Sequence, residues 1–343
     1  MRNLRQILGR LPWAFVILFD VAALLALLLA VLLVQTLPAI ISPAKTGKLS
    51  APNAGNPNAK RIAFSFDDAP RGPGAFLKLE QRPAMLIKAL RDGGVPGAAF
   101  FNNPGRISPI NNGADAIAAY ANAGHVIANH THNHSALSNV SPQAFLAEID
   151  EAEVWLKRQK NYRPWFRFPR LDEGRKDIVK RDAVRAGLKA RGLRNAYVTV
   201  DGWDWFMESR SIAAKKAGRA MNVDGLRKLY IETHVESANF SDNLAKRILG
   251  RRPVQMLLLH ETDLAAMYVD DLAQALRADG WEIVSADTAY ADPMAEMVPD
   301  PKFADGTMLE MLAWGKGITG GRWFPRNNTE EAQKLFASYV LNK

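Results

Sequence analysis

Two histidines stand four residues apart in the segment His130-Thr131-His132-Asn133-His134. Residues at this spacing share one face of a helical turn, so His130 and His134 could bind one metal ion, whereas His132 would point away from that face. Exposed histidine pairs and buried structural histidines are also common, so the pair needs a third, anionic ligand before it indicates a metal site. The chain has no cysteine, and that ligand must therefore be a carboxylate.

Two adjacent aspartates, Asp67 and Asp68, follow residues 62–66, which are apolar except for Ser65. Because neighbouring residues of a strand point in different directions, the two carboxylates could take different roles. Asp68 with His130 and His134 would provide the three protein ligands of a catalytic zinc-type site and leave one position for water. Asp67 could then accept a proton from that water as the water attacks an amide carbonyl.

Release of an amine from such a reaction also requires a general acid. His260 directly follows the apolar residues 256–259 and is the candidate proton donor. The alternative interpretation is a histidine that only caps the end of a buried strand.

The elements that must position these side chains follow from the alternation of short apolar runs with longer segments of helical periodicity. We expect strands at 62–66, 97–101, 126–128, 165–168, 196–200 and 255–259, and helices at 77–91, 115–123, 142–159, 177–190, 223–249 and 268–278. At least five of the strands end at reactive residues, which are Asp67-Asp68, His130, Arg167, Asp201 and His260. A single polar residue after a strand is often only a turn or cap residue. In a βα barrel, however, the C-terminal ends of all strands meet at the active site, so together these residues predict one pocket.

Five motifs carry a resemblance to a known family. They are Phe66-Asp67-Asp68-Ala69-Pro70, His130-Thr131-His132-Asn133-His134, Arg167-Phe168-Pro169-Arg170, Asp201-Gly202-Trp203-Asp204-Trp205 and Leu257-Leu258-Leu259-His260. In this order they resemble the motifs of the polysaccharide deacetylases, also called carbohydrate esterase family four or the NodB homology domain. The resemblance implies an α/β fold, a distorted seven-stranded (β/α)7 barrel, at residues 61–291.

The resemblance also implies roles for the site residues. Asp68, His130 and His134 would bind the metal, Asp67 would be the general base and His260 the general acid. Arg167 would hold Asp67, and Asp204 would orient His260.

Three further residues of these motifs would contact the substrate. The resemblance implies that Trp205 and Leu258 wall the small pocket for the acetyl methyl group, and that the backbone amide of Arg170 contributes to the oxyanion contact. Arg170 stands where the family usually has tyrosine, and Ala69 where it commonly has glycine. The first change places a cation beside the sugar site, and the second should be tolerated if the backbone angles suit alanine.

The N-terminal segment predicts a membrane anchor. Residues 12–34 are long and apolar enough to cross a bilayer as a helix, and Arg2, Arg5 and Arg10 precede them. The positive-inside bias then places residues 1–11 in the cytoplasm, and a flexible linker at 35–60 leads to a catalytic domain outside the cytoplasmic membrane. The alternative is a cleaved signal peptide, although the apolar run is long for one and the cleavage site is poor.

Composition narrows the classes of partner. Apolar residues make up 48% and charged residues 23% of the 343-residue chain, which is typical of a folded globular protein. The net charge of +9 is spread without a basic run or a nucleic-acid-binding motif, so it favours an anionic membrane or envelope polymer rather than nucleic acid. No oligomeric state is indicated.

The last segment, 292–343, contains Trp314, Trp323 and Phe324 among glycines and arginines and ends in an expected helix at 329–341. Large aromatic side chains mainly bury area, so we expect the segment to pack on the barrel; a substrate-groove extension is the alternative.

These features predict a metal-dependent hydrolase that removes N-acetyl groups from an extracytoplasmic polysaccharide, such as a glycan or peptidoglycan that contains N-acetylglucosamine, with metal-bound water as the nucleophile. Zn²⁺ suits the ligands, and Co²⁺, Ni²⁺ or Fe²⁺ would fit the same donors. Two alternatives remain: an O-acetyl esterase that acts on an acetylated polysaccharide, and a membrane-tethered glycan-binding protein without catalysis.

Overall fold

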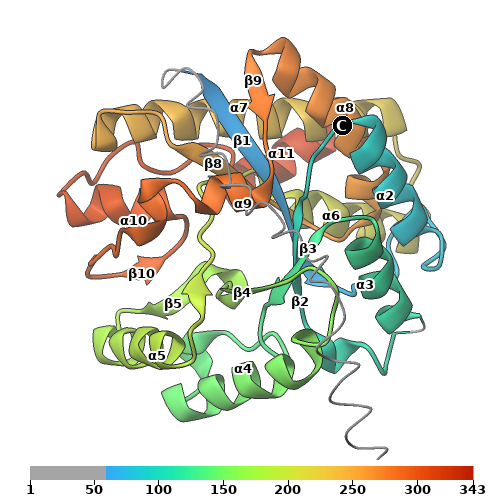
Figure 1. Ribbon diagram of the computed structural model, residues 1–343. Helices are drawn as coiled ribbons and strands as arrows, with labels where there is room; N and C mark the ends of the chain where they lie inside the picture. Colours follow the sequence, from blue (N-terminus) through green and yellow to red (C-terminus); the bar gives the residue numbers. More distant parts are fainter. Residues whose placement is uncertain (1–58, 111, 343) are drawn as a thin grey trace, which may run out of the picture. The chain divides into compact units, whose positions relative to one another are not determined.

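The structure is a computed structural model that describes residues 59–110 and 112–342 (Figure 1). The predicted membrane anchor at 12–34, the residues before it and most of the linker lie outside the described part of the chain. Among the described residues, no helix combines the length and the apolar character needed to span a bilayer.

The centre of the fold is a curled sheet whose strand pairs are all parallel. Its strands are β1 (Lys60–Ala69), β2 (Ala99–Asn102), β3 (Val126–Asn129), β4 (Tyr162–Phe166), β6 (Arg194–Asn195), β7 (Val200–Asp201), β8 (Val254–His260) and β9 (Trp281–Ile283). The order across the sheet is β6-β4-β3-β2-β1-β8-β7, and β9 pairs with β1 beside this path. A separate antiparallel ribbon joins β5 (Asp172–Arg175) to β10 (Ala304–Asp305).

Helices surround the sheet (Figure 1). They are α2 (Arg82–Asp92), α3 (Gly113–Asn122), α4 (Pro142–Leu156), α5 (Ile178–Ala190), α6 (Asp204–Lys216), α7 (Val223–Leu249), α8 (Asp263–Ala278), α9 (Ala286–Tyr290), α10 (Met308–Gly315) and α11 (Thr329–Val340). Four 3-10 turns stand at Pro104–Arg106, Leu137–Asn139, Pro169–Leu171 and Pro293–Glu296. Local sequence explains the clearest helix starts: Ser141 caps α4 by accepting a hydrogen bond from the Ala144 amide, and proline follows it.

The α/β class and the parallel strands are confirmed, and the curled sheet with its helices is consistent with a (β/α) barrel of the expected kind. The sheet has eight strands in the described part of the chain, where seven were predicted. The strand expected at 196–200 is wrong as one element, because residues 196–199 form the link between β6 and β7 at the two edges of the sheet. The strand expected at 97–101 starts at Ala99, since Gly97 has a φ of 49°, outside the extended region. The apolar pattern does not predict α6, whose buried face includes the polar Glu208 and Ser211.

The alternation of side chains along β1 sets up the site. Ile62, Phe64 and Phe66 belong to one hydrophobic cluster, which also contains buried residues of α2 and α8. Ser65 and Asp67 lie on the other face of the strand, where both contact Arg167. Burial of one face in the core therefore fixes the direction of the polar residues on the other.

Candidate active site

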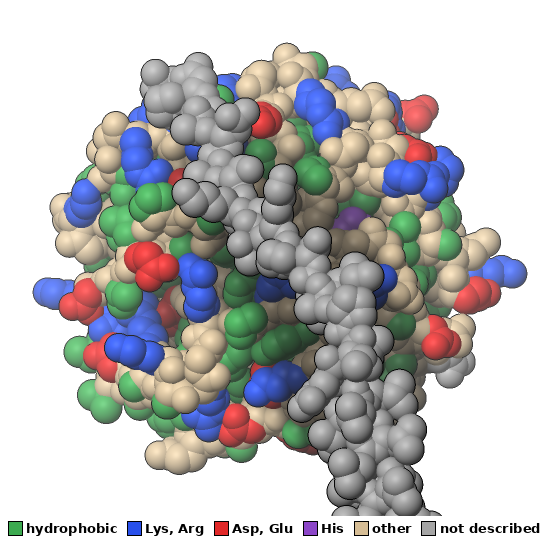
Figure 2. Space-filling view, in the orientation of Figure 1, with side chains coloured by type: hydrophobic (Ala, Val, Ile, Leu, Met, Phe, Trp, Pro, Cys, Tyr) green, Lys and Arg blue, Asp and Glu red, His purple; other side chains and the backbone are tan. Residues whose placement is uncertain are grey.

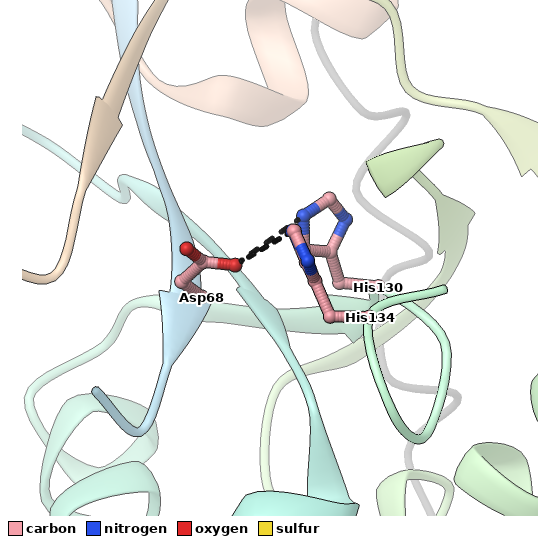
Figure 3. A group of neighbouring side chains, drawn as sticks. All are labelled: Asp68, His130 and His134. Carbon is pink, nitrogen blue, oxygen red and sulfur yellow. Dashed lines mark ion pairs between the residues drawn. The ribbon is translucent and has the colours of Figure 1, made fainter. Parts of the chain in front are cut away.

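Asp68, His130 and His134 lie together, as Figure 3 shows. One ligand atom from each residue lies within 4.8 Å of the other two. The Oδ1 atom of Asp68 is 2.9 Å from Nε2 of His134 and 3.8 Å from Nε2 of His130. Asp68 comes from the end of β1, and both histidines come from the segment that follows β3, so two separate strand ends form the cluster.

The two histidines meet through a turn, not through the helical face that their spacing suggested. His130 follows β3, and the chain then reverses with a φ of 65° at Thr131 and 63° at His134. The side chain of Asn129 accepts a hydrogen bond from the Thr131 amide (2.8 Å), and the Thr131 hydroxyl accepts one from the His134 amide (2.9 Å). His132 lies apart from the cluster, with Nε2 3.4 Å from Glu151 Oε1.

The hydrogen bonds of His130 suit a metal ligand. Its Nδ1 lies 2.9 Å from the carbonyl oxygen of Arg167, which can only accept, so Nδ1 carries the proton and Nε2 is left free to bind an ion. Burial lowers the pKa of His130 to about 4, which keeps the imidazole neutral. Burial alone would raise the pKa of Asp68, but the hydrogen bond and charge of His134 hold it well below its usual range. One anionic and two imidazole donors at this spacing fit a divalent cation.

Two arginines that the sequence did not single out also contact the Asp68 carboxylate. Arg71 Nη1 lies 2.7 Å from Oδ2, and Arg106 Nη1 lies 3.3 Å from Oδ1. Arg71 stands three residues after Asp68, a local spacing that could have suggested the contact, whereas Arg106 comes from a distant turn. The pair fixes the orientation of the carboxylate at the end of β1.

Asp67 is held by a buried arginine. Arg167 Nη1 donates to Asp67 Oδ1 (2.6 Å) and to the Ser65 hydroxyl (2.8 Å), while its Nε donates to the Ala196 carbonyl (3.0 Å). Its Nη2 donates to the hydroxyl of Tyr290 (2.7 Å), a residue of α9 that sequence reasoning missed. Because Arg167 is 1% exposed, these contacts leave its guanidinium one orientation, with Nη1 on Asp67.

His260 forms the second charged pair. Its Nδ1 lies 2.7 Å from Asp204 Oδ1, and its backbone amide donates to Asp204 Oδ2 (2.7 Å). Burial by itself lowers the pKa of His260, but the charge and hydrogen bond of Asp204 outweigh it and leave the pKa above its ordinary value. Burial raises and His260 lowers the pKa of Asp204, with a net decrease. The pair therefore favours an imidazolium beside a carboxylate.

The side chains proposed from the sequence as base, acid and metal ligands line one cavity of about 970 Å³. Asp67, Asp68, His130, His134 and His260 reach it, as do the three residues expected to contact substrate, Arg170, Trp205 and Leu258. Arg170 has a φ of 60°, whereas Ala69 is not among the residues with positive φ, so alanine fits there without strain. Figure 2 shows a hollow on one face of the molecule, with hydrophobic side chains and a histidine inside it.

The C-terminal segment also reaches this cavity. Helices α10 and α11 contact α7, in keeping with a segment packed on the barrel. Residues of the same segment line the cavity beside the metal-type cluster, among them Phe303, Trp314, Trp323 and Phe324. The segment 292–343 therefore both packs on the barrel and lines the cavity, two roles that the sequence analysis treated as alternatives.

The chain is similar to known deacetylases in sequence and in fold. Residues 54–191 match the family model of polysaccharide deacetylase. None of the curated proteins is significantly similar to the chain. Among solved structures, the chain is similar to the peptidoglycan deacetylase PdaC from Bacillus subtilis, with 18% identity, coverage of 69% of this chain and 92% of that chain, and a TM-score of 0.44. It is similar to the chitin deacetylase from the fungal pathogen Colletotrichum lindemuthianum, with 17% identity, coverage of 66% and 86%, and a TM-score of 0.46.

A family 4 carbohydrate esterase from Streptomyces lividans is a further similar structure, with 20% identity, coverage of 67% of this chain and 95% of that chain, and a TM-score of 0.42. The matched region 54–191 contains Asp67, Asp68, His130, His134 and Arg167, whereas Asp204 and His260 lie beyond it. Residues 54–191 are thus similar to the polysaccharide deacetylase family, in agreement with the resemblance of the sequence motifs.

Proposed function

We propose that the chain hydrolyses N-acetyl groups on a polysaccharide that contains N-acetylglucosamine, with the help of one divalent metal ion. One observation carries the proposal. A carboxylate held by an arginine and a histidine held by a carboxylate line the same cavity as a cluster that fits a cation, and this is the set of groups that amide hydrolysis needs.

Asp68, His130 and His134 would hold the ion, whose chemistry is to lower the pKa of water and to polarise the amide carbonyl. Asp67 acts as general base and takes the proton from the attacking water. Arg167 keeps the Asp67 carboxylate turned toward the cavity through their 2.6 Å contact. The neutral state of His130, which burial favours, leaves the Nε2 lone pair available to the ion.

His260 acts as general acid and gives a proton to the amide nitrogen as the bond to the acetyl carbon breaks. Its Nδ1 faces Asp204, so the proton that leaves comes from Nε2. The raised pKa of His260 keeps it charged over a wider pH range than an ordinary histidine. The base Asp67 thus has a cationic partner, Arg167, and the acid His260 has an anionic partner, Asp204.

The remaining cavity residues shape the acetyl site. Trp205 and Leu258 wall the space for the methyl group, and the backbone amide of Arg170 faces the developing oxyanion. The Arg170 side chain adds a cation at the cavity and favours sugars with acidic or strongly polar substituents nearby.

Zn²⁺ is the ion we propose first, with Co²⁺, Ni²⁺ and Fe²⁺ as ions that suit the same donors. The long apolar stretch at 12–34 supports an extracytoplasmic site of action, with the catalytic domain tethered to the cytoplasmic membrane.

The test is acetate release from matched acetylated glycans. An N-acetylglucosamine hexamer, N-acetylated peptidoglycan and O-acetylated xylan oligomers are each incubated with the Zn²⁺-loaded protein, and acetate is measured. The proposal predicts release from at least one N-acetylated substrate at a higher kcat/KM than from the xylan. Faster release from the xylan would establish an O-acetyl esterase instead, and binding without any release would establish a glycan-binding protein.

A further inference from the structure

In the C-terminal segment, the guanidinium of Arg322 packs against two tryptophan rings of the cavity wall, which stand at 69° to one another. The Cζ atom of Arg322 lies 3.8 Å from the ring centroid of Trp314 and 3.6 Å from that of Trp323. Arg322 Nη1 also donates to the Thr319 carbonyl (3.0 Å), and the side chain is only 2% exposed. A buried guanidinium with rings on it and a backbone acceptor has little freedom, so the orientation of the Trp323 ring is fixed.

Trp323 is nevertheless open to the cavity. Of the tryptophans in the described part of the chain, only Trp205 and Trp323 are exposed, at 37% and 54%, and both line this one cavity. An indole that stays exposed gains no free energy from burial in the core. Exposed aromatic rings that are held in one orientation are typical of binding surfaces. The position of the two exposed indoles therefore points to a ligand.

The polar residues of this cavity suit a sugar. The C–H face of a pyranose ring packs on an aromatic ring, while its hydroxyls need acceptors at the ring edge. Asp305 and Glu310 of the same segment and Asp201 at the end of β7 line the same cavity and supply carboxylate oxygens. Aromatic walls with a few polar groups are the usual composition of a small-molecule site.

The cavity has room for more than the reacting group. At about 970 Å³ it is close to the upper end of the roughly 300–1,000 Å³ range of ligand pockets. Trp205 stands at the proposed acetyl site, so Trp323 is available to a second sugar unit. The segment that carries Trp323 lies outside residues 54–191, the region that matches the family model.

We propose that Trp323, fixed by Arg322, binds the sugar unit next to the one that is deacetylated, and so makes the site selective for an oligomeric glycan over a single sugar. This inference rests on the proposed function for the identity of the ligand. Trp323 is a specificity residue here, because it acts on sugar binding and does not touch the reacting bond. Energy from such a remote contact can be used to place the acetyl group on the ion.

The test compares Trp323→Ala with Trp323→Phe and with Val298→Ala, a control in the same segment at a side chain that is 72% exposed and does not line the cavity. Calorimetry measures the Kd of Zn²⁺-loaded protein for N-acetylglucosamine and for its hexamer, a readout that does not need turnover. Circular dichroism confirms that each variant is folded.

The expected result is a loss of at least tenfold in the preference for the hexamer over the monomer in Trp323→Ala, with partial retention in Trp323→Phe and full retention in Val298→Ala. An unchanged preference in Trp323→Ala, equal weakening of both ligands, or no binding of the hexamer by the parent protein would overturn the inference. Failure of the proposed function looks different, because the hexamer then binds with the predicted preference and no acetate is released.

Discussion

Asp67 and His260 are register partners on the neighbouring strands β1 and β8. Residues paired in this way lie side by side, here near the C-terminal ends of the two strands. The proposed base and acid therefore reach the cavity from adjacent positions. Each has its own buried partner: Arg167 for Asp67 and Asp204 for His260. The proposed general base and general acid therefore occupy one pair of neighbouring positions in the sheet.

Substitution Asp67→Asn should remove the base without removing the metal. We expect kcat for acetate release to fall by about 10²- to 10⁴-fold, the usual contribution of a positioned general base. Because Asp68 and both histidines are intact, metal analysis should still find one ion per chain. Turnover at the parent rate in this variant would refute the assignment of Asp67.

Substitution Asp204→Asn should change the pH dependence. The Asp204 carboxylate holds the pKa of His260 above its ordinary value, while burial acts in the opposite direction. Without that charge the pKa of His260 falls, so the protonated acid is lost at lower pH as the pH rises. The alkaline limb of the kcat/KM profile should move to lower pH, and kcat/KM near neutral pH should drop roughly 10- to 100-fold. A profile that keeps its alkaline limb would speak against His260 as the acid.

Substitution Tyr290→Phe tests the anchor of Arg167. It removes the acceptor of the 2.7 Å bond from Nη2, and a buried charged donor left without a partner costs about 1–3 kcal/mol of unfolding free energy. We expect a lower kcat as well, because Arg167 then holds Asp67 less firmly. Tyr197→Phe is the matched control, since its hydroxyl is also buried but bonds only the Ala289 carbonyl (3.2 Å). Equal kcat in the two variants would show that Tyr290 does not act through Arg167.

Binding of the ion should stabilise the fold. At a free Zn²⁺ concentration of about 100 times Kd, the gain is about 2.7 kcal/mol, which thermal unfolding detects as a higher Tm. His134→Ala should abolish most of the rise, whereas His132→Ala should keep it, because His132 faces Glu151 and lies apart from the cluster. A rise in Tm that persists in His134→Ala and is lost in His132→Ala would show that the ion binds elsewhere.

The sequence predicted the right histidine pair for an incomplete reason. A spacing of four suggested a helical face, but His130 and His134 meet because Thr131 and His134 adopt positive φ in a turn tied by Asn129. Such a turn depends on side-chain hydrogen bonds and not on apolar periodicity, so periodicity could not reveal it.

Contacts between residues that are far apart in the chain could not be predicted from the sequence either. Arg167 and Tyr290 are 123 positions apart, and their bond depends on how α9 packs beside the sheet. The apolar content of 196–200 predicted one strand, whereas residues 196–199 link two sheet edges, a distinction that tertiary structure decides. The polar residues near the strand ends were easier to predict, because they directly follow apolar runs: His260 is the last residue of β8, and Asp67 lies two residues before the end of β1.

The central claim is that Asp68, His130 and His134 hold one ion on which deacetylation depends. The most direct measurement is acetate release from the N-acetylglucosamine hexamer by chelator-stripped protein as Zn²⁺ is added back. The account predicts no release from the stripped protein and a linear recovery that ends at one ion per chain, with no recovery in His134→Ala. Full activity of the stripped protein, or equal recovery in His134→Ala, would contradict it.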